Sequence, residues 1–124
     1  MKGETKMPAK KQPNLPLKKE ALLPVLKVAE LSTCHVTRQD ADRLADGEPG
    51  PLIAYPYDEG FYVLVPPDLE SNSKKVCRFA KEAILEAFSP AMLDVLMLAA
   101  KQGFRQVRFD CDSPKVPGLQ KFDW

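Results

Sequence analysis

The feature that most constrains the fold of this chain is a helical stretch that is apolar on nearly all sides. Ser89 and Pro90 are typical of a helix start, because serine caps the first turn and proline fits the first helical position. The stretch AMLDVLMLAAKQ follows, with Asp94 as its one acidic interruption, and Gly103 ends it. A helix without a polar face needs other elements to cover it. We therefore expect this helix to be the central and most buried one.

A strand with one solvent-exposed face is predicted directly after this helix, in FRQVRFDCDS. Apolar residues alternate with polar ones, so that one face carries Val107, Phe109 and Cys111 and the other carries Gln106, Arg108, Asp110 and Asp112. This period of two is typical of a strand with one side in the core and the other in water.

The residues from 25 to 65 predict a strand, a short helix and a hairpin. VLKVAELSTCHV (residues 25–36) is rich in β-branched residues and lacks Gly and Pro, which indicates a strand. Thr37 is a typical N-cap for a short helix that Gly47 ends. Two apolar runs flank a turn at Gly60, and Pro56 in the first run favours the edge of a sheet.

A second long helix is amphipathic. Its apolar stripe recurs at helical spacing and consists of Val76, Phe79, Ala80, Ala83, Ile84, Ala87 and Phe88. Charged residues occupy the wet face, so the stripe is predicted to face the core. The predicted order is β-α-β-β-α-α-β: an α+β (α/β two-layer) fold with a small mixed sheet of about four strands and helices on one face.

Composition divides the chain into two parts. Residues 1–22 contain three prolines and six lysines, which predicts a disordered basic tail, and residues 23–124 have the length of a single globular domain. The net charge of +1 divides into +4 on residues 1–20 and −3 on the rest. A mildly acidic fold is not typical of a nucleic-acid-binding domain. Nucleic-acid binding through the lysine-rich tail stays open as an alternative.

Several classes of protein are disfavoured. No apolar run approaches the roughly 20 residues of a membrane span, and the basic N-terminus is followed by prolines and lysines where a secretory signal has an apolar region. The three cysteines lack C-x-x-C spacing. We therefore expect a cytoplasmic protein with free thiols and no membrane contact.

The stretch LSTCHVT (residues 31–37) places the only histidine, His35, beside Cys34. A zinc site or a Cys–His nucleophile needs both side chains to converge, whereas neighbours on a strand point to opposite faces. His35 would meet Cys111 only if the first and last strands pair. We expect a buried, inert Cys34, a half-exposed His35, no metal and no cofactor.

Asp110 and Asp112 allow two interpretations. A D-x-D pair can hold a divalent cation in a small metal-dependent hydrolase or nuclease-like enzyme, with His35 as general base and Thr33 beside it. The pair can also be a solvated strand end with Arg108 as counter-ion. The second interpretation is favoured, because no third acid or phosphate loop accompanies the pair.

The C-terminal VPGLQKFDW allows two interpretations as well. Leu119, Phe122 and Trp124 either close the core of the domain or offer Phe122 and Trp124 to a partner protein. Core closure is favoured, since a domain of this size needs the burial.

Three of these motifs occur together in a known family. The chain has an S-T-x-H-V-T start at residues 32–37, an F-D-x-D strand and an F-D-W ending, and it resembles a family of small uncharacterised bacterial proteins of plasmids, integrated elements and phages. That family usually has tyrosine where this chain has Phe122. The matching residues are Thr33, His35, Thr37, Asp110, Asp112, Asp123 and Trp124.

The resemblance implies a mobile-element accessory protein. Together with the missing catalytic set, it leads us to expect a non-enzymatic protein-interaction module with a protein partner. The expected binding surface consists of Thr33, His35, Asp110, Asp112 and Trp124. The metal-dependent enzyme using Asp110 and Asp112 and the nucleic-acid-binding tail are the alternatives.

Overall fold

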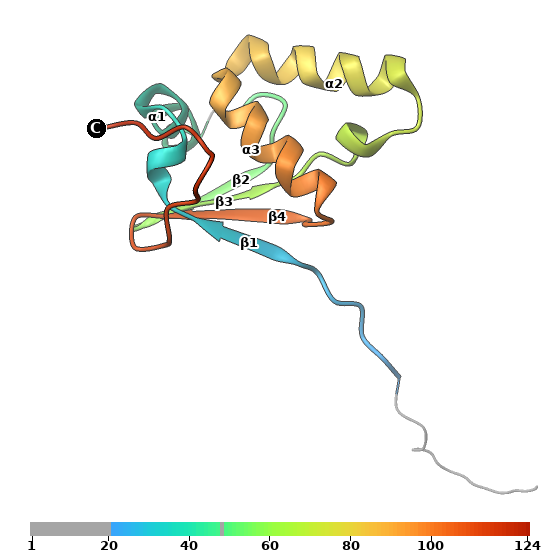
Figure 1. Cartoon of the computed structure of the whole chain (residues 1–124), viewed down its shortest axis with the longest axis horizontal. Coiled ribbons are helices and arrows are strands. Elements are labelled where there is room, and N and C mark those ends of the chain that lie inside the picture. The colour runs from blue at the N-terminus through green and yellow to red at the C-terminus, as the bar shows by residue number, and fades with distance from the viewer. Residues whose placement is uncertain (1–20, 48) are drawn as a thin grey trace, which may run out of the picture.

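Four strands form one mixed sheet, and three helices cover one of its faces (Figure 1). The computed structural model describes residues 21–47 and 49–124. The elements are β1 (Val28–Leu31), α1 (Arg38–Ala45), β2 (Ala54–Tyr57), β3 (Gly60–Leu64), α2 (Lys74–Ala87), α3 (Pro90–Lys101) and β4 (Gln106–Asp110). Short 3-10 turns lie at Thr33–His35 and Pro67–Glu70. The predicted α+β fold and its element order are confirmed, while the predicted disordered tail falls largely on residues 1–20, outside the described residues.

The last strand lies inside the sheet, next to the first. The strand order is β1-β4-β3-β2, with β1 parallel to β4 and the other two pairs antiparallel. β2 is an edge strand, as Pro56 predicted. β1 forms the other edge.

Helix α3 is the most buried helix, as expected. It begins where Ser89 caps the Met92 N–H and Pro90 takes the first helical position. Met92 and Leu96 are completely buried, and α3 lies between the sheet and α2 (Figure 1). The buried Asp40 joins the starts of α1 and α3, because its carboxylate accepts hydrogen bonds from the backbone N–H groups of Thr37 and Ser89.

The first strand is shorter than the predicted strand over residues 25–36. β1 ends at Leu31, and Ser32 then caps the 3-10 turn by accepting a hydrogen bond from the Cys34 N–H. The prediction that Cys34 and His35 lie on a strand is therefore wrong. The reason is local, since a serine that bonds to the backbone two residues on competes with strand pairing.

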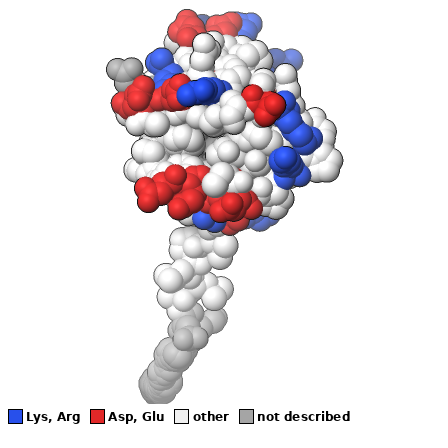
Figure 2. Space-filling model, turned by 90° about the vertical axis from the view of Figure 1, so that its left-hand side faces the viewer, with Lys and Arg blue, Asp and Glu red and all other residues white. Residues whose placement is uncertain are grey.

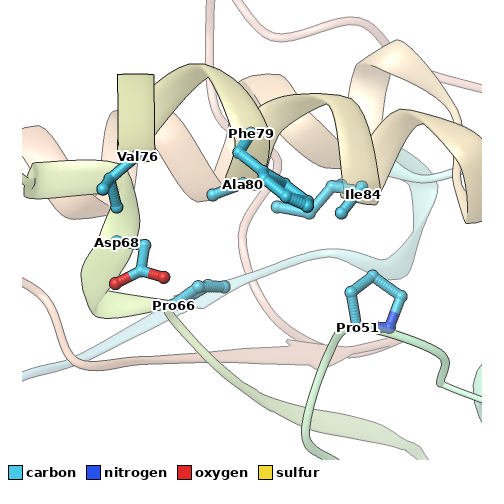
Figure 3. A pocket seen from close by; sticks show the side chains of 8 residues that line it. Pro51, Pro66, Asp68, Val76, Phe79, Ala80 and Ile84 are labelled. Atoms are coloured by element: carbon cyan, nitrogen blue, oxygen red, sulfur yellow. The ribbon is translucent and has the colours of Figure 1, made fainter. Parts of the chain in front are cut away.

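The apolar stripe of α2 is buried over only part of its length. Ile84 and Phe88 are buried, whereas Val76 is 40% and Phe79 is 69% exposed. The exposed part lines an open groove of about 420 Å³ together with Pro51 and other residues (Figure 3). The prediction that the whole stripe faces the core is wrong for Val76 and Phe79, because their side chains line this groove instead of packing into the core.

We expect the two halves of this stripe to differ in their contribution to stability. Ile84→Ala leaves a cavity in the core and should lower the free energy of unfolding by about 2–5 kcal/mol. Phe79→Ala removes an exposed ring and should change it by less than about 0.5 kcal/mol. Urea unfolding followed by circular dichroism measures both. A similar loss for the two variants would contradict the exposed position of Phe79.

Candidate functional site

His35 is buried and holds the C-terminal tail. Its ring is 1% exposed, its Nδ1 lies 2.9 Å from the carbonyl oxygen of Gln120, and its Nε2 accepts a hydrogen bond of 2.8 Å from the Val116 N–H. Both contacts are satisfied by the neutral imidazole with its proton on Nδ1. The expectations of a half-exposed His35 and a buried Cys34 are wrong, since Cys34 is partly exposed. Neither ring nitrogen is free to act as a general base.

The tail packs along the same 3-10 turn. Phe122 N–H donates to the Cys34 carbonyl at 2.7 Å, and the indole N–H of Trp124 donates to the Val36 carbonyl at 3.0 Å. Leu119 packs against the hydrophobic core, while Trp124 is 51% exposed. The predicted core closure therefore holds for Leu119, whereas Trp124 ends the tail as a half-exposed indole that is fixed at its N–H.

Asp110 is the centre of a hydrogen-bonded network on the sheet face that points away from the helices. Its Oδ2 accepts from the Tyr57 hydroxyl at 2.6 Å and from the Arg108 guanidinium at 3.1 Å. Its Oδ1 accepts from the Asp112 N–H at 2.8 Å, and Arg108 Nε donates to the Tyr57 hydroxyl at 2.9 Å. Arg108 is the counter-ion that the sequence predicted. Both carboxylate oxygens of Asp110 are thus engaged.

The sheet register aligns this network with a row of side chains across all four strands. Arg108 lies opposite Glu30 on β1 and opposite Tyr62 on β3, and Tyr62 lies opposite Tyr55 on β2. The helices cover the other face, so this face is open. We call Glu30, Tyr55, Tyr57, Tyr62 and Arg108 the open-face row.

Gly60 makes the contact between Tyr57 and Asp110 possible. In the register Gly60 stands opposite both of them, and it has no side chain to separate them. A Cβ atom at Gly60 would lie 1.7 Å from the carbonyl oxygen of Phe109. The glycine is therefore required for the close pairing of β3 and β4 at this point.

Aromatic and ionic contacts fix Arg108 in the middle of the row. Its guanidinium carbon lies 5.6 Å from the ring centre of Tyr57 and 5.8 Å from that of Tyr62, within the range of cation–π attraction. Glu30 Oε2 lies 3.5 Å from Arg108 Nη1. The two tyrosine rings pack on each other with their centres 5.4 Å apart. Arg108 is consequently held by partners on both neighbouring strands.

The same contacts determine the ionisation states of Asp110 and Tyr57. The Tyr57 hydroxyl, followed by the Asp112 N–H and the charge of Arg108, lowers the pKa of Asp110 below its ordinary value, against the opposing effect of burial. Burial and the hydrogen bond to Asp110 raise the pKa of Tyr57. At neutral pH the carboxylate is therefore ionised and the phenol is protonated, which is the pair of states that the hydrogen bond requires.

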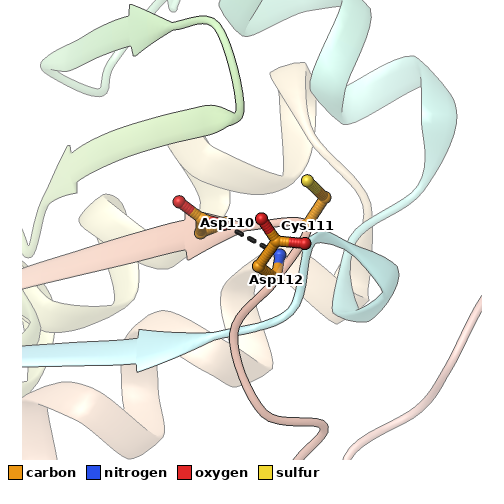
Figure 4. A group of neighbouring side chains, drawn as sticks. All are labelled: Asp110, Cys111 and Asp112. Carbon is orange, nitrogen blue, oxygen red and sulfur yellow. Dashed lines mark hydrogen bonds between the residues drawn. The ribbon is translucent and has the colours of Figure 1, made fainter.

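Asp110, Cys111 and Asp112 form the one group of metal-ligand side chains found among the described residues (Figure 4). The predicted common strand face for the two aspartates is wrong, because β4 ends at Asp110 and Cys111 is exposed. Burial and the nearby carboxylates raise the pKa of the Cys111 thiol, so it stays protonated at neutral pH. With Asp110 already bonded, Asp112 is the free anionic ligand of this group.

Acidic side chains border the open-face row. A shallow pocket at the end of the sheet is lined by Glu30, Glu59, Arg108, Asp110, Asp112 and Ser113. Figure 2 faces the end of the domain to which this pocket belongs, and it shows acidic side chains gathered in a band along the lower part of the body. The rim of the open face is therefore negatively charged.

The predicted binding surface is only partly brought together. Asp110 and Asp112 are neighbours, whereas His35 contacts the tail and Trp124 contacts Val36. The sequence interpretation missed Tyr57, Tyr62 and Glu30. Their signal was the tyrosine-rich hairpin, but the register that joins them to Arg108 depends on strand pairing between distant segments.

The family of the chain follows from a sequence profile. The profile described as "Family of unknown function (DUF5983) C-terminal domain" matches residues 28–124. The chain belongs to this family. The match begins at the first residue of β1 and includes the open-face row of the DUF5983 domain. The chain has no match among curated proteins or among solved structures. No helix in the described part of the chain combines the length and the apolar character that crossing a bilayer requires.

We expect His35→Ala to destabilise the DUF5983 domain and release its tail. The substitution empties a buried site and leaves the Val116 N–H and the Gln120 carbonyl without a partner, so the free energy of unfolding should fall by about 2–5 kcal/mol. Urea unfolding measures this loss, and limited proteolysis should show faster cleavage after Pro114. Lys121→Ala, at an exposed position of the same tail, is the control and should behave as the parent chain. If His35→Ala were as stable as the parent chain, the proposed role of His35 in holding the C-terminal tail would be contradicted.

Tyr57→Phe should make the domain more sensitive to acid. Because the folded state lowers the pKa of Asp110, the stability from this group is full above about pH 4 and is lost as the pH falls through the lowered pKa. Without the Tyr57 hydroxyl, this pKa moves back toward its ordinary value, so acid unfolding should begin at a higher pH. Circular dichroism during acid titration measures the midpoint. Tyr55→Phe on the same face should leave the midpoint unchanged, and equal midpoints for all three proteins would refute the role of the hydroxyl.

Proposed function

We propose that the DUF5983 domain is a non-enzymatic protein-interaction module that binds a basic segment of a partner protein on its open sheet face. The observation that carries the proposal is the open-face row itself. Tyrosine and arginine dominate the energetic centres of protein interfaces. Here two tyrosines pack against one arginine and a third tyrosine lies on the next strand, on a face that no helix of the described chain covers. Tyr55 is 58% exposed and is the most exposed tyrosine of the open-face row.

The row is held in place before a partner arrives. Arg108 is fixed by two rings and two carboxylates, so little side-chain freedom would be lost on binding. The acidic rim formed by Glu30, Glu59 and Asp112 favours a partner segment with lysines or arginines. The same rim disfavours the phosphates of nucleic acid.

The geometry favours binding over catalysis. A general base needs a free proton-accepting atom beside the substrate. Both nitrogens of His35 and both carboxylate oxygens of Asp110 already have partners within the domain. Asp112 alone does not provide the several converging oxygens that a divalent cation prefers.

We further propose that the chain is an accessory protein of a mobile genetic element and acts in the cytoplasm. The support for the element is the combination of the S-T-x-H-V-T start, the F-D-x-D strand and the F-D-W ending. A protein of this kind would act by occupying or recruiting a host or element-encoded protein.

Site-specific photo-crosslinking in the native host tests the proposed face. A photoreactive phenylalanine analogue replaces Tyr55, and the matched control carries it at Leu85, an exposed apolar position on α2. We expect one prominent cross-linked protein from position 55 and not from position 85, with a peptide rich in lysine or arginine at the cross-link. Raised salt should weaken the product, because the rim is acidic.

Two further variants distinguish binding at the open-face row from nonspecific hydrophobic association. Tyr62→Ala should reduce the product from position 55, while Phe79→Ala should leave it unchanged. No product at position 55, or the same product at positions 55 and 85, would refute binding at the open face.

A further inference from the structure

The outer edge of β1 is unpaired in the described part of the chain. β4 is the one strand neighbour of β1. The Lys27 carbonyl accepts hydrogen bonds from the N–H groups of Arg105 and Gln106, so Lys27 faces β4. Backbone groups alternate along a strand, and Val28 and Glu30 therefore direct their N–H and C=O groups outward. An edge of this kind is a template for another strand.

An apolar segment continues directly from this edge. Residues 21–27 extend away from the domain in Figure 1, and the side chains of Leu22, Leu23, Val25 and Leu26 are 60–95% exposed. The sequence predicts a strand from residue 25, whereas β1 begins at Val28. Residues of strand-forming type thus lack a pairing partner within the described chain.

An apolar groove runs beside the same edge on the helix side of the sheet. It encloses about 380 Å³ and is lined by β1 residues, by Leu98 and Ala99 of α3 and by Phe104. The edge strand, the projecting apolar segment and the groove are adjacent. The edge strand leaves backbone N–H and C=O groups unpaired, and the segment and the groove leave apolar side chains exposed to solvent.

We propose that the chain forms a two-fold symmetric dimer in which residues 25–31 of two copies pair antiparallel along the β1 edge. A second copy is the occupant that satisfies every one of these features at once, because the same stretch is both the projecting segment and the receiving edge. Symmetric pairing of identical surfaces is the commonest form of homodimer. The two four-stranded sheets then become one continuous sheet.

The positions of the outward backbone groups define the register. With the two-fold axis at Val28, Val28 of one copy stands opposite Val28 of the other, and Leu26 stands opposite Glu30. All of these residues have outward N–H and C=O groups. The pairing ends beyond Val25 and Leu31, because Pro24 has no N–H and the Ser32 N–H already donates to the Pro114 carbonyl. Val25 falls opposite Leu31 on the groove side.

Sedimentation equilibrium of the full chain tests the dimer. We expect a mass of twice the 13.8 kDa chain, with dissociation on dilution. Val28→Pro removes an outward N–H without breaking the β1–β4 pairing, so it should yield a folded monomer. The matched control is Ala54→Pro on the opposite edge strand, where Pro56 is already tolerated, and it should remain dimeric.

Leu26 tests the register. Leu26→Lys places a positive charge opposite Glu30 of the second copy, and Leu26→Asp places a negative one there, so the dissociation constants should differ by about tenfold in favour of lysine. Equal constants for the two variants would overturn the register. A monomeric parent chain at about 1 mM, or a Val28→Pro variant as dimeric as the parent, would overturn the dimer.

Discussion

The burial of α3 against one side of the sheet is the constraint on which the rest of the structure depends. A helix that is apolar nearly all round needs the sheet on one side and α2 on the other, so all three helices gather on the same face. Among the residues that the structure describes, no helix covers the opposite face. Its side chains must satisfy one another, and the open-face row around Arg108 does so with hydrogen bonds, an ion pair and packed rings.

The parts of the fold that depend on neighbouring residues could be predicted from the sequence. The Thr37 cap of α1 and the Ser89–Pro90 start of α3 act within one helical turn, and both are present. The contacts that define the sites join distant segments. His35 bonds to residues more than 80 positions away, and the open-face row depends on a register between four strands. Residue spacing does not contain this information, and the turn at Ser32 removed the strand geometry assumed for His35.

The polar motif residues acquire a different meaning once these distant contacts are known. From the sequence, the polarity of these residues suggested that they form one shared binding surface. Thr37 instead caps a helix, His35 clasps the tail, and the Trp124 N–H donates to a backbone carbonyl. Buried or partly buried polar groups are costly unless paired, so a turn and a tail that close a small core require specific polar partners. Thr37, His35 and Trp124 therefore contribute to closing the domain, and the open-face row contains none of the motif residues.

The proposed dimer and the proposed binding face are coupled through the sheet. Pairing along β1 would join the two open faces, since Glu30 lies both at the end of the open-face row and on the paired edge. Two rows on one continuous surface would engage two basic segments of a single partner, or of a repeated one. The second segment would then bind at high effective concentration, so that two individually weak contacts give a stable complex without further contacts. A small domain that binds through the proposed open face would gain most from this arrangement, because a single shallow face offers few deeply buried anchors.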